Sequence, residues 1–230
     1  ALASLLSQIY SVALYAYLIF IKNVPMNIRG KWRLKPAIIK KSLAIGLPSG
    51  FTYFLLSVNM LITYRVVGVY GTQALASIGI GFRILQSIYL PVVALSSAMA
   101  AMVAQNFGAR RPSRIYRTLW TGWGISSAVM VLGTLLCLLF PAFLVAVFND
   151  DREVIAYGTT YLSIMGLGNI LVGTIMCVSA VFQGIGKTYP TFLAAVLDNG
   201  LYAVMVFTLP GIFGWGIEAV WWIKLLTAFL

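Results

Sequence analysis

The chain is divided into long apolar runs, and this division constrains its fold more than any other feature. A helix that crosses a bilayer needs about 20 mostly apolar residues. Segments of this kind lie at 1–21, 43–67, 74–105, 118–147, 154–182, 191–209 and 213–230. Of the 230 residues, 61% are hydrophobic and only 9% are charged, which leaves too few polar side chains to cover a folded chain in water. We therefore expect an all-α polytopic membrane protein with about seven transmembrane helices.

Some of these runs should form irregular helices. The segments 74–105 and 118–147 are too long for an upright span, so we expect tilt, kinks or protruding ends there. Pro48, Pro91 and Pro141 lie inside apolar runs. Each should bend its helix, because proline cannot donate the main-chain hydrogen bond.

The basic residues lie in alternate loops. The net charge is +11, but its distribution between apolar runs is typical of membrane orientation rather than of nucleic-acid binding. Most of the basic residues fall in the loops at 22–42, 106–117 and 183–190. The positive-inside rule predicts that these loops are cytoplasmic. We expect membrane lipids, and not nucleic acid, as partners.

Tryptophans lie near the predicted ends of the spans. Trp32 and Trp120 are near the cytoplasmic edge, and Trp215, Trp221 and Trp222 are near the outer edge. Tryptophan is enriched at the membrane–water interface, so we expect all five to be belt residues.

Asp198 is the acidic residue placed furthest inside a predicted span, about seven residues after Thr191. A charge in a span is costly and invites a functional interpretation. Two interpretations stay open. Asp198 is a binding site for a proton, a coupling cation or a substrate, or it is paired with a basic residue or wetted from the cytoplasmic side.

Three further ionisable residues lie in or near spans. Arg83 is about nine residues into its helix and is either a partner for an anionic group or a structural residue that binds main-chain carbonyls. Glu218 lies near the start of the last helix, where the helix dipole stabilises an acid. Lys224 is six residues further on, too far around the helix to pair with Glu218, and an aqueous cavity could hold its ammonium.

Uncharged polar residues give a weaker indication of a site. Asn59 and Thr63 are four residues apart and share one face of a helix, and Asn169 lies in the fifth span. Interhelical hydrogen bonding and ligand binding are both open for Asn59 and Asn169.

The sequence does not predict an enzyme. The chain has no histidine, and Cys137 and Cys177 lie in apolar runs, where they act as small hydrophobic residues. The segment QGIGKT at 183–188 ends like a phosphate-binding loop, but Val181 stands where the first glycine should be. We expect no cofactor and no metal site.

Several motifs together resemble those of the multidrug and toxic compound extrusion (MATE) transporters. IGLPSG at 45–50 is similar to the start of the family's seventh helix, and GTQALASIGIGFRI at 71–84, with Arg83, to the stretch that leads into the eighth. MVAQNFGARRPSR at 102–114 resembles the element that closes that helix at the cytoplasmic face. DDREVIAYGTTYL at 150–162 and QGIGKTYP at 183–190 flank what would be helix ten.

The helix-end motif has a physical interpretation as well. Gly108 should permit a tight exit from the helix before Ala109. The amide side chain of Gln105 can bind end carbonyls, and Arg110 can hold the helix end at the anionic leaflet.

The resemblance implies one six-helix lobe of a twelve-helix, two-lobe transporter of the NorM or DinF type in the cell (inner) membrane. Residues 43–230 would be the carboxy-terminal lobe with helices seven to twelve, 1–21 would be helix six, and 22–42 the cytoplasmic linker between lobes. The chain begins and ends inside apolar runs, so we expect it to be a piece of a longer protein.

The family's activity is export of amphipathic, often cationic, compounds in exchange for protons or sodium ions, with the amino-terminal lobe as partner. Some NorM-like members carry acids in helices seven and ten, whereas 43–67 and 154–182 contain none. The coupling proton or sodium ion would then bind in the amino-terminal lobe, or Asp198 would contribute to binding it. A lipid-linked oligosaccharide flippase of the same superfamily architecture is the alternative, although only Arg83 and Lys224 would supply basic groups within spans.

Overall fold

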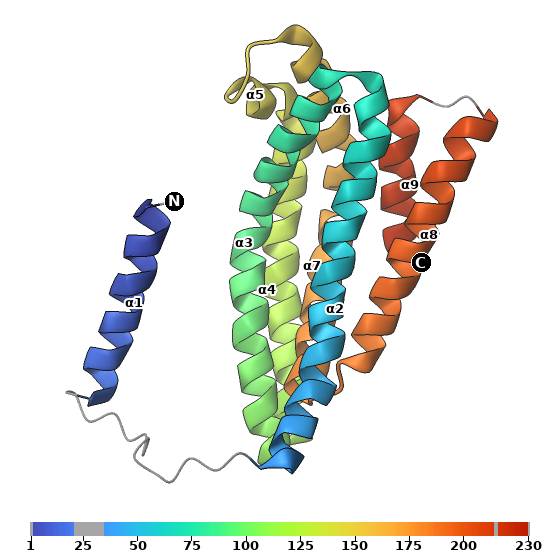
Figure 1. Ribbon diagram of the computed structural model, residues 1–230. Coiled ribbons are helices and arrows are strands. Elements are labelled where there is room, and N and C mark those ends of the chain that lie inside the picture. Colours follow the sequence, from blue (N-terminus) through green and yellow to red (C-terminus); the bar gives the residue numbers. More distant parts are fainter. Residues whose placement is uncertain (1, 21–34, 214–215, 230) are drawn as a thin grey trace. The chain divides into compact units, whose positions relative to one another are not determined.

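The structure is a computed structural model that describes residues 2–20, 35–213 and 216–229, and these residues form helices joined by short turns (Figure 1). The chain divides into two units, Ala1–Lys40 and Lys41–Leu230. In the first unit, α1 (Leu2–Phe20) is an apolar helix. Most of the predicted linker at 22–42 lies outside the described residues, and α2 begins at Pro36, within that range.

The second unit contains the remaining helices, except that residues 36–40 of α2 fall in the first unit. They are α2 (Pro36–Val67), the short 3-10 helix η1 (Gly68–Tyr70), α3 (Thr72–Gly108), α4 (Pro112–Leu139), α5 (Pro141–Ala146), α6 (Arg152–Leu167), α7 (Asn169–Gly184), α8 (Tyr189–Phe213) and α9 (Ile217–Phe229). The prediction of an all-α membrane protein is confirmed. Among the described residues, four helices are long and apolar enough to cross a bilayer, or five if α6 and α7 count as one bent span.

Two of the predicted apolar runs are each split into two helices. The run at 118–147 breaks at Phe140, where α4 has ended at Leu139 and α5 begins with Pro141. Proline favours the first turn of a helix and restricts the residue before it, so Pro141 starts a new helix instead of bending a continuous one. Pro48 and Pro91, in contrast, lie inside α2 and α3.

The run at 154–182 is also split, because α6 and α7 meet at Gly168 with a bend of 49°. A β-carbon at Gly168 would lie 2.7 Å from Cδ1 of Leu225, so the missing side chain lets α9 approach the bend. The hydroxyl of Thr134 donates a hydrogen bond of 2.9 Å to the carbonyl of Gly166. A carbonyl near a helix break in a membrane needs such a partner.

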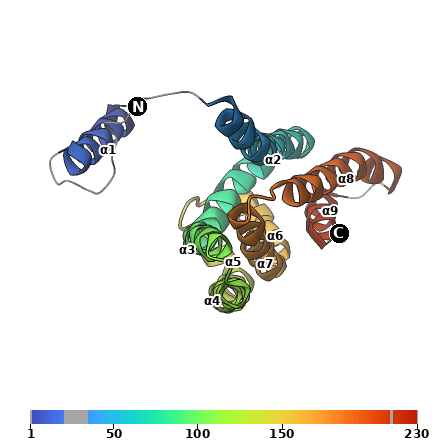
Figure 2. The ribbon, with the colours of Figure 1, turned by 90° about the horizontal axis from the view of Figure 1, so that it is seen from below.

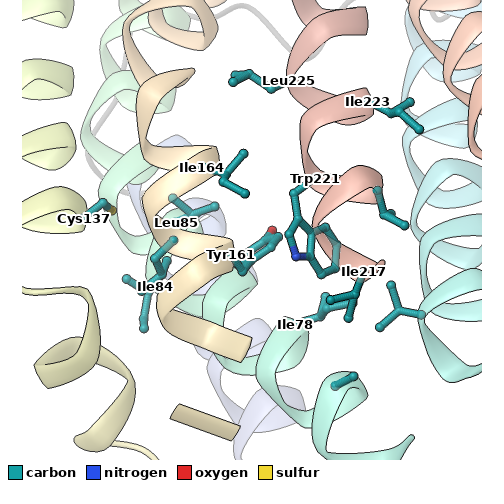
Figure 3. Packing of buried hydrophobic residues seen from close by; sticks show 14 of the residues in the cluster. Ile78, Ile84, Leu85, Cys137, Tyr161, Ile164, Ile217, Trp221, Ile223 and Leu225 are labelled. Atoms are coloured by element: carbon teal, nitrogen blue, oxygen red, sulfur yellow. The ribbon is translucent and has the colours of Figure 1, made fainter. Parts of the chain in front are cut away.

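The core lies where α3, α6, α8 and α9 meet. In the view from below, α3, α4, α6 and α7 form one group, with α9 beside α6 and α8 beside α9 (Figure 2). Figure 3 shows Tyr161 of α6 facing Trp221 of α9, and their ring centroids are 4.9 Å apart in an edge-to-face arrangement. Aromatic pairs of this geometry are favourable beyond the area that they bury.

Trp221 corrects one sequence prediction. It is 2% exposed and belongs to the core, so its assignment to an interfacial belt is wrong. The neighbouring Trp222 points to the other side of α9 and is exposed, as is Trp120 on α4. Trp32 and Trp215 lie outside the described residues.

The outer surface of the second unit is apolar, as a lipid-facing surface must be. Large hydrophobic side chains are exposed on most of its helices, for example Leu132, Phe143, Val204 and Phe207. A surface of this kind is unusual for a protein in water and agrees with a multi-pass membrane protein.

Small residues allow the helices to approach closely. A β-carbon on Gly81 of α3 would overlap the ring of Tyr161, and one on Gly122 of α4 would overlap Met99. Small residues at such contacts drive helix association in membranes, where lipid removes the hydrophobic force between helices.

Gly81 therefore should not accept a side chain. We expect Gly81→Ala to lower the free energy of unfolding by about 1–3 kcal/mol, the usual effect of overpacking, because the Trp221 contact prevents the Tyr161 ring from moving. The measurement is thermal unfolding of the purified protein in micelles. Gly79→Ala is the matched control, since a β-carbon there meets nothing within 4 Å. Equal stability of the two variants would contradict the packing argument.

Candidate functional site

Asp198 of α8 and Lys224 of α9 form an ion pair inside the helix bundle. Nζ of Lys224 lies 3.1 Å from Oδ2 and 3.4 Å from Oδ1 of Asp198. Asp198 is nine residues past the start of α8, roughly 14 Å along the helix axis at the usual rise. The side chains of Lys224 and Asp198 are 24% and 28% exposed. The sequence left open whether Asp198 binds a ligand or is paired with a basic residue. The structure shows that it has a basic partner, Lys224.

Tyr202 adds an aromatic face to this ion pair. It lies four residues after Asp198 on α8 and so projects from the same side of the helix. The ammonium of Lys224 is 5.0 Å from the centre of the Tyr202 ring, within the range of a cation–π interaction. Lys224 is thus held by a carboxylate and a ring, both from α8.

The phenol of Tyr202 connects α8 to α2. Its oxygen lies 2.7 Å from Oγ1 of Thr63, while the Thr63 hydroxyl donates to the carbonyl of Asn59 at 2.9 Å. Because that bond uses the one hydroxyl hydrogen of Thr63, the phenol of Tyr202 is the donor to Thr63. The side chain of Tyr202 is fully buried.

Two other contacts set the register of α2 against α8. The hydroxyl of Thr188 donates to the carbonyl of Ile45 at 3.0 Å, and the rings of Phe51 and Phe192 are 6.2 Å apart. These contacts and the Thr63–Tyr202 bond join residues of nearly constant separation along the chain, so α2 and α8 run parallel. The position one turn before Thr63 on α2 therefore lies at the same height as the position one turn before Tyr202 on α8.

Two asparagines occupy that level, Asn59 on α2 and Asn199 on α8. Each is 8% exposed. Within the described part of the chain, Nδ2 of Asn59 and Oδ1 of Asn199 have no hydrogen-bond partner, although Nδ2 of Asn199 donates to the carbonyl of Ala195 at 2.7 Å. A buried polar atom without a partner is costly, and such atoms mark places where a polar ligand or water is favoured.

Contacts across three helices join Thr63, Tyr202, Lys224 and Asp198, and the two asparagines lie at the same height on α2 and α8. We call these six residues the polar cluster. It comprises Asn59, Thr63, Asp198, Asn199, Tyr202 and Lys224. Of the four predicted site residues, Asp198 and Asn59 belong to it. The sequence also indicated Lys224 as a possible cavity residue but did not predict its pairing with Asp198. The sequence analysis missed Tyr202. Its position one turn after Asp198, the acid placed furthest inside a predicted span, could have indicated that it belongs to the site.

The other two predicted site residues lie elsewhere. Asn169, the first residue of α7, is fully buried and accepts a hydrogen bond of 3.1 Å from the phenol of Tyr89. Arg83 is exposed on α3, and no ion pair joins it to another described residue. The structure favours the interhelical hydrogen-bond interpretation for Asn169.

The helix-end motif closes α3 in a way that the sequence did not predict. Arg110, and not Gly108, has the positive φ of 54°. The amide of Arg110 donates to the carbonyl of Phe107, and that of Arg111 to the carbonyl of Asn106, the bonds of a Schellman motif. The carbonyl of Gln105 accepts from the amide of Ala109 at 3.0 Å. Gly108 is the last residue of the helix.

No group of three His, Cys, Asp or Glu side chains within the described ranges is placed to hold a metal ion. The two cysteines are buried and unpaired.

The MatE family model matches residues 48–208 of the chain. The probable multidrug resistance protein NorM of Pseudomonas aeruginosa is 28% identical over 201 residues, which are 85% of this chain and 41% of that protein. The multidrug export protein MepA of Staphylococcus aureus is 23% identical over 221 residues, 93% of this chain and 48% of that protein. The chain thus spans less than half the length of these relatives.

Solved structures show the same fold. A crystal structure of MATE in the straight conformation aligns with a TM-score of 0.86 at 20% identity, covering 98% of this chain and 52% of that one. A transporter of the MOP superfamily from Pyrococcus furiosus aligns with a TM-score of 0.76 at 19% identity, covering 83% of this chain and 42% of that one.

The bond between Thr63 and Tyr202 should contribute measurably to the docking of α2. In a double-mutant cycle of Thr63→Val and Tyr202→Phe, we expect a coupling free energy of about 0.5–1.5 kcal/mol in thermal or denaturant unfolding in micelles. Thr208→Val is the control partner for Tyr202→Phe, because Thr208 is exposed on α8 and its hydroxyl bonds only to the carbonyl of Val204 among the described residues. Additive effects of Thr63→Val and Tyr202→Phe would contradict the bond.

Proposed function

The chain belongs to the MatE family, and from this premise we propose that it forms the carboxy-terminal lobe, with the helix before it, of a cation-coupled multidrug antiporter. The chain covers about half of the related transporters, as one lobe with an additional helix would. The relatives named as multidrug resistance and export proteins support efflux of small organic compounds as the activity. The coupling ion is a proton or a sodium ion.

The observation that carries the proposal is the partly buried ion pair of Asp198 and Lys224 between two helices of a lipid-facing bundle. Charged groups inside a membrane are costly and mark pathways for ions or substrates. A carboxylate beside an aromatic ring suits the cationic part of an amphipathic compound. We therefore assign recognition of cationic substrates to the polar cluster, and the main coupling acid to the amino-terminal lobe, as in DinF-like members.

Transport requires both lobes. Substrate sites in secondary transporters lie between or within two halves that rock against each other around a fixed site. In this chain, the hydrogen bonds and the ring contact between α2 and α8 keep Thr63 bonded to Tyr202, whose ring lies against the Lys224 ammonium.

A lipid-linked oligosaccharide flippase is less well supported. A pyrophosphate group would require several basic side chains in the cavity. Of the two basic residues well inside the spans, Arg83 is exposed on α3 and Lys224 is neutralised by Asp198.

Asp198→Asn tests the proposed function in the full-length protein. A fluorescent cationic dye is added outside everted membrane vesicles, and its uptake into the lumen is followed under a proton gradient and then under a sodium gradient. We expect one gradient to drive the dye in the wild type and Asp198→Asn to slow it by about tenfold or more at equal protein level, because a charge contact to the cation is lost. Asp150→Asn removes the same charge from an exposed turn and should have no effect.

Two outcomes would contradict the proposal. Dye movement that is unchanged in Asp198→Asn would remove recognition from the polar cluster. No dye movement under either gradient would refute antiport of cationic compounds and favour the flippase.

We also propose that the basic turns face the cytoplasm. Arg110, Arg111 and Arg114 lie exposed at the turn from α3 to α4, and the acidic turn before α6, with Asp150, lies at the other end of the bundle. We expect Asp150→Cys to react with a membrane-impermeant maleimide on intact cells and Arg111→Cys to react only after lysis. Cys137 and Cys177 of this chain are buried and should react slowly. The reverse pattern would invert the topology.

A further inference from the structure

We propose that Lys224 is a tethered occupant of an organic-cation site made by the Asp198 carboxylate and the Tyr202 ring, and that a substrate cation displaces it. This inference rests on the proposed function, because it says which chemical class the polar cluster binds and how. The ligands are monovalent organic cations, such as amines and quaternary ammonium or phosphonium compounds.

The ammonium of Lys224 already lies where such a cation would bind. It is 3.1 Å from Oδ2 of Asp198 and 5.0 Å from the centre of the Tyr202 ring. A carboxylate supplies charge, and the face of an aromatic ring stabilises a cation that carries its charge on a bulky apolar group. Both groups come from one face of α8, and Tyr202 is buried, so a ligand reaches the ring when the Lys224 side chain moves away from it.

When Lys224 leaves, it gives up two contacts, the ion pair with Asp198 and the contact with the Tyr202 ring. Among the described residues, its ammonium makes hydrogen bonds only to Asp198. The side chain is 24% exposed, so part of it already reaches the surface of the bundle. A lysine ammonium is strongly hydrated and sits on a flexible four-carbon stem, which lets it move to water when another cation takes its place.

Charge balance makes displacement the favourable way to bind a cation here. Adding a cation beside the intact pair would place two positive charges and one negative charge in a medium of low dielectric, where repulsion is strong. Exchanging the lysine for a ligand keeps one positive and one negative charge in the site. One cation therefore replaces another, and a neutral compound gains nothing from the exchange.

The neighbouring asparagines add polar positions for the ligand. Oδ1 of Asn199 is buried next to Asp198 in sequence and has no hydrogen-bond partner within the described ranges. It can accept a hydrogen bond from a protonated amine, whereas Nδ2 of Asn59 can donate to a ligand oxygen. The Tyr202 ring favours an organic cation over a small inorganic one, because hard cations prefer a shell of oxygen ligands.

Equilibrium binding of tetraphenylphosphonium to the full-length protein in lipid nanodiscs tests the inference. We expect Lys224→Met to bind about tenfold more tightly than the wild type, because the internal competitor is removed and the ring and carboxylate are left free. Lys187→Met removes an exposed charge outside the site and should bind as the wild type does. Lys224→Arg should bind more weakly than Lys224→Met, because a guanidinium can hold the Asp198 carboxylate with two hydrogen bonds and keeps the site occupied. Asp198→Asn combined with Lys224→Met should lose the gain. Wild-type affinity in Lys224→Met would overturn the inference.

A second test uses the wild-type protein, so its result does not depend on whether a variant folds. Acylation of lysines by an amine-reactive reagent is followed by mass spectrometry as tetraphenylphosphonium is added. We expect labelling of Lys224 to rise several-fold on saturation while that of Lys187 stays constant, since a displaced ammonium becomes accessible. Constant or falling labelling of Lys224 would overturn the inference, and so would an equal rise caused by sodium chloride alone.

The two proposals can fail separately. Tight binding and release of Lys224 without dye transport would leave the cation site in place and refute the antiporter. Dye transport that depends on Asp198, with equal binding by the wild type and Lys224→Met, would refute the role of Lys224 alone.

Discussion

An isolated charge is unstable inside a bundle that faces lipid, and this constraint governs how the last helices of the chain are arranged. Asp198 and Lys224 stabilise each other only as a pair, because removing one partner leaves a charge in a medium of low dielectric. Their contact joins α8 to α9. Tyr202, which lies against the same ammonium, then extends the polar contact to α2 through Thr63.

The second unit combines two kinds of packing. Around α3, α4, α6 and α7, small residues allow close helix contact, and most of the buried side chains are apolar, although Asn169 and Tyr89 form a polar bond there. The contacts of α2 with α8 are fewer and include polar bonds at Thr63 and Thr188. The polar bonds at Thr63 and Thr188 contribute about 0.5–1.5 kcal/mol each, as typical hydrogen bonds do. A polar cluster at the edge of a rigid group of helices suits a site that exchanges ligands.

The sequence was sufficient to predict the helical fold and much of its organisation. An apolar run that is long enough to cross a membrane satisfies its main-chain hydrogen bonds by forming a helix. It did not predict the breaks at Phe140 and Gly168, since a single proline or glycine in an apolar run is compatible with a bent helix or with two. Trp221 was placed at the interface although it packs on Tyr161. Sequence cannot distinguish Trp221 from Trp222 without knowing which face of α9 is buried.

The candidate site was predictable only in part. Asp198 is conspicuous as an acid in a span, but its partner depends on the relative heights of α8 and α9. Asp198 lies fifteen residues before the end of α8, whereas Lys224 lies only seven residues after the start of α9. Two residues that face each other across a simple helical hairpin would lie at similar distances from the turn, so the sequence alone does not predict this pair. Arg110 was likewise expected to contact lipid, while its left-handed backbone became evident only from the structure.

The most direct test of the account is an experimental structure of the full-length protein with tetraphenylphosphonium bound. The account predicts the phosphonium between the Asp198 carboxylate and the Tyr202 ring, with the Lys224 ammonium beyond hydrogen-bonding distance of Asp198 and turned toward water. A structure in which Lys224 remains bonded to Asp198 while the phosphonium occupies another part of the protein would contradict it.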